Sequence, residues 1–432
     1  MVLANLLQSL SGTLNNVFVG QMLGTQALAA VSGLFPILFF FISLVIGIGA
    51  GASVLIGQAW GARELAKVKA IAGTALALGL LIGVLVALFG GAFTEGLLGA
   101  LGTPADVMPI AVGYARTMML AMPGLLVFIL LTQLMRGVGD TVTPLLALTI
   151  STAVSCVLTP AFIRGWFGLP QLGVTSAAVA AIASFAAALA FLAWHMLRRK
   201  HPLAPDRELL RAMRVDPVLL KLVVKIGLPT GVQMIVISLA EIALLAIVNG
   251  YGSNATAAYG AVTQVVNYVQ FPALSIAITA SILGAQAIGR GEPEQLRAIT
   301  RTALKMNLVV TGALVVLGYL FSRHLMALFI TSEPVIELAQ TLLHIMLWSS
   351  LVFGFASVLG GVMRASGTVL VPTAISIFCI AAIEVPSAWT LSHHVGLNGV
   401  WMAYPITFAA MLLLQGLYYQ LVWRKRRIVR MV

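Results

Sequence analysis

The chain alternates between long apolar runs and short breaks that contain polar residues, glycine or proline. A helix that spans a bilayer needs about 20 mainly apolar residues, and runs of that length recur from one end of the chain to the other. The breaks predict an all-α membrane protein with six spans in each half. The predicted spans are 1–22, 27–58, 69–93, 108–135, 143–165, 172–197, 217–250, 255–288, 300–322, 334–363, 369–392 and 398–423.

Composition supports lipid as the main solvent of this chain. Of 432 residues, 60% are hydrophobic and only 9% are charged, which leaves more apolar surface than a soluble fold of this length can bury. The two cysteines, Cys156 and Cys379, lie far apart in apolar segments and predict neither a disulfide nor a metal cluster. The sequence shows no Walker motif, nucleophile elbow or metal-ligand cluster, so it predicts no cofactor, no metal site and no enzyme activity.

The basic residues predict the orientation of the chain in the membrane. If the C-terminus faces the cytoplasm, 22 of the 25 Lys and Arg residues lie inside, and only Arg116, Arg164 and Arg323 lie outside. This bias predicts a bacterial inner-membrane protein with both termini in the cytoplasm, and it explains the net charge of +12 without a nucleic-acid partner. Asp140, at the cytoplasmic end of the fourth span, is expected to pair with Arg136.

One long polar segment divides the chain near its middle. It contains RRKHPLAPDRELLRAMRVDPVLLK, within which a linker between two lobes is expected. The basic tail WRKRRIVR is expected to anchor the topology, and contact with anionic lipid headgroups is the alternative. The predicted divisions are an N-lobe at 1–197, a linker at 198–216, a C-lobe at 217–423 and a basic cytoplasmic tail at 424–432.

The two halves match at a constant offset of 228 residues. The offset holds without a gap over four separated blocks, which predicts an internal repeat. The blocks pair 23–31 (LGTQALAAV) with 251–259 (YGSNATAAY), 52–61 with 280–289, 69–76 with 297–304, and 135–144 (MRGVGDTVTP) with 363–372 (MRASGTVLVP). Because each half has an even number of predicted spans, the repeat is parallel, with its pseudo-two-fold axis along the membrane normal. The offset also places Pro229 opposite Met1, which suggests either a shortened start or a misassigned initiation codon.

The repeated blocks carry a family resemblance. NNVFVGQMLGTQALAAV, GQAWGARELAKVK and MRGVGDTVTP occur in this order, and the sequence resembles the multidrug and toxic compound extrusion (MATE) family over essentially its whole length. The resemblance implies twelve helices in a V-shaped pair of bundles, and antiport of organic, often cationic, compounds against protons or sodium. Two positions depart from the family pattern, since Asn15 and Thr159 stand where the family commonly has Asp. Loading of the coupling ion on an N-half carboxylate therefore cannot operate unchanged here.

Of the thirteen acidic residues, eleven fall in predicted loops or at the ends of predicted spans, and two, Glu241 and Glu384, lie well inside a span. A carboxyl group in the membrane interior costs several kcal/mol, so it is usually protonated, paired or exposed to a water-filled cavity. Burial disfavours the charged form, which suits such a group to exchange a cation, and both residues are candidate cation-coupling residues. The alternative is a neutral acid that hydrogen-bonds to a neighbouring helix. Ser238 lies close to Glu241 in sequence, and Pro386 frees a backbone carbonyl close to Glu384.

The predicted span 255–288 has the most regular polar face. Four of its polar side chains recur at intervals of 4, 4 and 3 residues, within an arc of about 80°. Such a stripe can line a substrate cavity, or it can hydrogen-bond to a neighbouring helix. The candidate substrate-cavity residues are Tyr259, Thr263, Asn267 and Gln270 on this span, with Gln233 and Asn15 as weaker additions.

These observations predict a secondary active multidrug efflux antiporter. It would export small, drug-like organic cations by alternating access in exchange for H⁺ or Na⁺, and it would work as a monomer among membrane lipids. The alternative is a flippase for a lipid-linked precursor with the same fold. A flippase would need a strongly basic central cavity for a pyrophosphate group, and the interiors of the predicted spans, away from their ends, contain almost no Lys or Arg.

Overall fold

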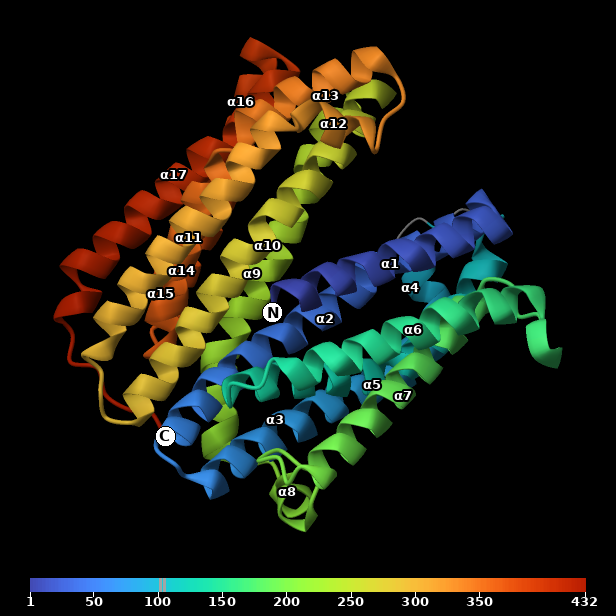
Figure 1. The fold of residues 1–432 in the computed structure, drawn as a ribbon. Helices are drawn as coiled ribbons and strands as arrows, with labels where there is room; N and C mark the ends of the chain where they lie inside the picture. Colours follow the sequence, from blue (N-terminus) through green and yellow to red (C-terminus); the bar gives the residue numbers. More distant parts are fainter. Residues whose placement is uncertain (101–102, 104–105) are drawn as a thin grey trace. The chain divides into compact units, whose positions relative to one another are not determined.

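The computed structural model describes residues 1–100, 103 and 106–432, and its regular elements in those residues are all helical (Figure 1). The first half contains α1 (Val2–Leu23), α2 (Thr25–Gly61), α3 (Leu65–Leu85), α4 (Thr94–Ala100), α5 (Met108–Gly137), α6 (Val142–Arg164), α7 (Thr175–Arg198) and the short α8 (Arg207–Ala212). The second half contains α9 (Pro217–Asn249), α10 (Ser253–Gly289), α11 (Gln295–Leu320), α12 (Ser322–Ala327), α13 (Glu333–Met346), α14 (Ser349–Ala365), α15 (Leu370–Phe378), α16 (Val385–Val395) and α17 (Leu397–Leu421). The predicted all-α class is confirmed.

Ten helices in the described part of the chain are long and apolar enough to cross a membrane, and eleven if the bent pair α13–α14 is one span. The helix that corresponds to the predicted span 1–22 is α1, which is 22 residues long but is not among the ten. Its polar residues, such as Asn15 and Asn16, reduce its apolar character. Three predicted spans contain interruptions: α13 and α14 meet at a bend of 40°, and short π-helices occur at η1 (Val86–Gly90) and η3 (Cys379–Glu384).

Residue contacts divide the chain into two compact units. One unit comprises Met1 and Leu3–Gly231, and the other comprises Val2 and Val232–Val432. The boundary between these units falls inside α9, because the first turns of α9 pack against α2. At this packing contact, a methyl group added to Gly47 of α2 would lie 2.5 Å from the carbonyl oxygen of Gly227 and 2.5 Å from the nitrogen of Gly231.

The 228-residue repeat is visible in the backbone. Helices α2 and α10 are both 37 residues long, and their first and last residues correspond at this offset. The residues before them, Gly24 and Gly252, have φ angles of 89° and 96°. Gly139 and Gly367, after α5 and α14, also correspond, with φ angles of 91° and 78°. The two halves therefore share turn geometry as well as helix length.

The segment after α7 is fastened to the first unit by ion pairs. The Lys69 ammonium on α3 lies 2.6 Å from a carboxylate oxygen of Asp206 and 2.6 Å from one of Glu208. The Lys69 side chain is only 10% exposed. Asp206 also caps α8 by accepting a hydrogen bond from the Leu209 amide. The hydrogen bond from Lys69 and the one from the Leu209 amide lower the pKa of Asp206.

The expectation that Asp140 pairs with Arg136 is wrong. Arg136 donates instead to the Gln133 side-chain oxygen at 3.1 Å. One oxygen of Asp140 accepts from the backbone amides of Val142 and Thr143, and the other lies 3.4 Å from Nε2 of His201. The turn after α5 places the Asp140 carboxylate over the start of α6. The free backbone amides there bind it more effectively than the Arg136 side chain does, which lies one turn earlier.

We expect Asp140→Asn to destabilise the first unit by about 1 kcal/mol at pH 7, because it removes a charged hydrogen-bond acceptor. Burial alone would raise the pKa of Asp140, but hydrogen bonds from His201 and Thr143 hold that pKa well below its usual range. The ionised Asp140 carboxylate therefore stabilises the folded first unit fully above the usual carboxyl pKa of about 4. This stabilisation is lost as the pH falls further. Thermal unfolding in detergent should show a difference between the two proteins that is constant above about pH 5 and narrows in stronger acid. A difference that does not narrow at low pH would contradict this linkage.

Candidate functional site

The second unit contains both predicted coupling acids and places them close enough to interact electrostatically. Glu241 lies in α9, and Glu384 is the last residue of η3. Glu384 is buried, with 5% of its surface exposed, whereas Glu241 is exposed. The two carboxyl groups interact electrostatically, and within the described residues neither forms an ion pair with a basic side chain. Repulsion between them disfavours the state in which both are charged.

An apolar cluster holds the segments that carry these acids. Ala240, which precedes Glu241, packs in one cluster with Cys379 and Ile380 of η3, and Ile383 packs against the same cluster. The π-helix that carries Glu384 ends just before Pro386, which has no amide hydrogen to continue the regular hydrogen bonds. Short π-helices of this kind are frequent at functional sites. The interruption therefore sets the position of Glu384 on its helix.

Two tyrosines accompany the acids. The hydroxyls of Tyr259 on α10 and Tyr404 on α17 lie 3.3 Å apart, and both tyrosines interact electrostatically with Glu241 and Glu384. The ring of Trp401 lies 5.2 Å from that of Tyr259. Tyr404 was missed in the sequence, although it is one of few polar groups within the apolar stretch of the last span. The site thus contains two carboxyl and two phenol groups.

The other predicted cavity residues of the second unit are less closely associated with the acids. Thr263, half-buried, lies one turn after Tyr259 on α10 and interacts with it. Gln233 and Gln270 are half-buried and Asn267 is exposed. A cavity of about 370 Å³ in the first unit and one of about 930 Å³ in the second are lined by other residues. The role of these side chains in a substrate cavity stays a prediction.

Asn15 lies in the first unit, apart from the acids. Its side-chain oxygen accepts hydrogen bonds from Thr159 at 3.0 Å and from Ser155 at 3.4 Å, so it joins α1 to α6. The two positions at which the family resemblance leads one to expect Asp are therefore in direct contact, and here they form a neutral pair. This contact supports a packing role for Asn15. It also leaves the acids of the second unit as the candidate ion site.

Among the described residues, no group of three or more His, Cys, Asp and Glu side chains could hold a metal ion. The oxygen atoms associated with this site are the carboxylate oxygens of Glu241 and Glu384 and the hydroxyl oxygens of Tyr259 and Tyr404. Such oxygen ligands suit a proton or a hard cation.

The apolar helices define a multi-pass membrane protein. The MatE family profile matches residues 1–161 and 229–390, two segments that begin 228 residues apart. The chain belongs to this family, whose members are membrane transporters, and the predicted family is confirmed.

The relatives include a protein named for multidrug resistance and one named as a transporter. The chain is 44% identical over 434 residues to the probable multidrug resistance protein YoeA of Bacillus subtilis, covering 100% of this chain and 94% of that protein. It is 26% identical to an FAD transporter of Shewanella oneidensis, covering 94% of this chain and 89% of that one. A solved structure of a variant of the Vibrio cholerae MATE transporter VcmN is 21% identical and covers 99% and 95% of the two chains, with a TM-score of 0.90. This likeness confirms the fold.

Proposed function

We propose that this protein is a secondary antiporter that exports small, drug-like organic cations in exchange for H⁺ or Na⁺, and that it has no enzyme activity. The observation that carries the proposal is the pair of carboxyl groups, Glu241 and Glu384, which interact without a basic partner in the described part of a membrane protein. A bound cation would relieve the repulsion between them. A membrane position makes this exchange sensitive to the ion gradient.

The coupling follows from opposite preferences of the ion and the substrate for two conformations of the transporter. A proton or sodium ion that binds at the two acids would favour one conformation of the transporter, and an organic cation would favour the other. Tyr259, which interacts electrostatically with both acids, has an aromatic ring of the type that contacts organic cations, and this ring is 7% exposed in the present conformation. The names of relatives, which include both multidrug resistance proteins and an FAD transporter, support a small organic substrate.

The flippase alternative has less support. It would need a basic cavity inside the membrane to hold pyrophosphate. The arginine-lined cavity of the second unit is formed by helix ends and the tail, and not by the interior of the spans.

The proposal predicts gradient-driven dye movement in inverted membrane vesicles that contain the protein. An imposed pH gradient or an imposed sodium gradient should drive accumulation of a fluorescent organic cation several-fold above that in vesicles without the protein. Imposing each gradient separately would identify the coupling ion. If neither gradient moves any of a panel of cationic dyes, the antiporter assignment is wrong.

A further inference from the structure

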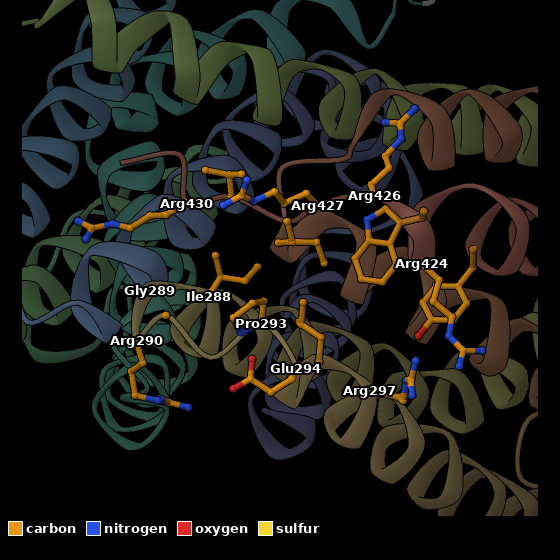
Figure 2. Close-up of a pocket in the computed structure, with 16 residues that line it drawn as sticks. Ile288, Gly289, Arg290, Pro293, Glu294, Arg297, Arg424, Arg426, Arg427 and Arg430 are labelled. Atoms are coloured by element: carbon orange, nitrogen blue, oxygen red, sulfur yellow. The ribbon is translucent and has the colours of Figure 1, made fainter.

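A cavity of about 930 Å³ lies at one end of the second unit, far along the chain from Glu241 and Glu384. Its walls are the end of α10, the start of α11, the end of α17 and the chain that follows α17. Figure 2 shows Arg427 and Arg430 on one side and Pro293 and Glu294 on the other. Among the residues that line the cavity, Glu294 is the one acid. Six others are arginines: Arg290, Arg297, Arg424, Arg426, Arg427 and Arg430.

The tail is packed against the unit and forms a fixed wall. The Trp423 indole nitrogen donates a hydrogen bond to the Ser366 hydroxyl at 3.0 Å, and its ring stacks on Tyr419 with the ring centroids 5.1 Å apart. Further on, the Met431 side chain packs against Gly367. A side chain at position 367 would occupy the space that Met431 fills. These contacts hold the arginines between Trp423 and Met431 over the cavity.

Several of these charges lack a neutralising partner. Arg290 pairs with Glu292 at 3.0 Å, and Arg426 lies over the Tyr418 ring at 6.0 Å. Within the described residues, Arg297, Arg424 and Arg427 form no ion pair. Positive charges around one cavity repel each other, and this repulsion is unfavourable. An anion bound in the cavity would attract them and offset the repulsion.

The internal repeat shows what occupies the corresponding place in the first unit. At the 228-residue offset, Arg297 near the start of α11 corresponds to Lys69 near the start of α3. In the first unit, the chain after the last span folds back and places Asp206 and Glu208 on Lys69, each at 2.6 Å. In the second unit, the chain after the last span also folds back, but it brings arginines to this place. The chain after the last span therefore brings two acids to this place in the first unit and arginines in the second.

We propose that this cavity binds the phosphate group of an anionic membrane lipid. Arginine forms paired hydrogen bonds with phosphate oxygens, and several guanidinium groups line this space. The cavity lies directly beyond an apolar span, next to Tyr419 and Trp423, which are residue types typical of the membrane interface. Its volume falls within the range of ordinary small-ligand sites. A cluster of basic residues just beyond a span attracts anionic lipids, and the charge distribution predicts that this end faces the cytoplasm.

The test is lipid retention by the full-length protein, measured by native mass spectrometry after purification in detergent. Phosphatidylglycerol should bind in preference to phosphatidylcholine. The triple variant Arg297→Gln, Arg424→Gln, Arg427→Gln should lower the affinity for phosphatidylglycerol at least about tenfold, on the basis of typical contributions of basic residues near lipid. The matched control is Arg198→Gln, Arg199→Gln, Lys200→Gln, which removes the same charge at the end of α7, and it should retain wild-type affinity.

A second variant keeps every arginine. Val429→Glu places a carboxylate on the cavity wall, as the first unit does with its own acids, and it should also weaken phosphatidylglycerol binding. If the wild type and both cavity variants retain the same amount of phosphatidylglycerol, the proposal is overturned. Full competition by millimolar inorganic phosphate or glycerol phosphate would overturn the assignment to a lipid. If the control triple variant loses as much affinity for phosphatidylglycerol as the cavity variants, the effect is one of general charge. That result would overturn the assignment of the site to this cavity.

Discussion

Export driven by an ion gradient should fall at least about tenfold in Glu384→Gln, a loss in the range of typical coupling energies. Glutamine keeps the size and hydrogen-bonding capacity of the side chain but can neither release a proton nor hold a cation by charge. Glu384 is the more buried of the two acids and interacts with Glu241, Tyr259 and Tyr404, so its loss should remove the centre of the ion site. The measurement is dye accumulation in inverted vesicles under the gradient that energises the wild type.

The controls separate coupling from folding. Glu337→Gln removes an exposed acid of α13 in the same unit and should leave export unchanged. Glu384→Gln should retain the melting temperature of the wild type and should still exchange substrate for substrate across the membrane. Glu241→Gln should cause a similar loss of gradient-driven export. Full gradient-driven export in both glutamine variants would contradict the assignment of the coupling site.

Gly47→Ala should destabilise the first unit by about 1–3 kcal/mol, the usual cost of a side chain inserted where no space exists. The added methyl group would meet the backbone of Gly227 and Gly231, and backbone atoms cannot move aside as a flexible side chain can. Close approach through small residues is the usual way in which membrane helices pack. The thermal unfolding temperature in detergent should fall by several degrees.

Gly33→Ala is the matched control in the same helix. An added methyl group there would have no neighbour within 4 Å, so the variant should be neutral or slightly stabilised, as expected for alanine in a helix. If Gly47→Ala is as stable as Gly33→Ala, the close packing of α9 on α2 does not contribute to the stability of the unit.

Much of the fold could be predicted from the sequence, because the membrane requires long apolar helices and a repeat constrains both halves. The predicted span 27–58 corresponds to α2, and the repeat offset relates the ends of α2 to those of α10. Apolar content could not predict the bend between α13 and α14 or the π-helix η3. A helix with such an interruption can have the same hydropathy as a regular helix. For the same reason, the short α4 and α8 were not expected.

The site was predicted only in part. Glu241 and Glu384 are recognisable because acids are rare inside spans, but their interaction depends on how α9 packs against η3. The contact of Asn15 with Thr159 joins residues 144 positions apart in sequence, and no local pattern indicates it. The basic tail was recognised as a charged segment, yet the cavity that it forms depends on its return to Ser366 and Gly367.

The paired turns also bear on how the two halves diverged. A duplicated gene starts with identical halves, and each later substitution must suit the inherited backbone. At the turn after α10, Gly291 has a φ of 80°, a conformation that glycine adopts without strain, whereas its counterpart Arg63 after α2 has a φ of 61°. An arginine in this conformation costs roughly 1–2 kcal/mol. The shape of this turn has therefore been retained through divergence even where the residue best suited to it has not.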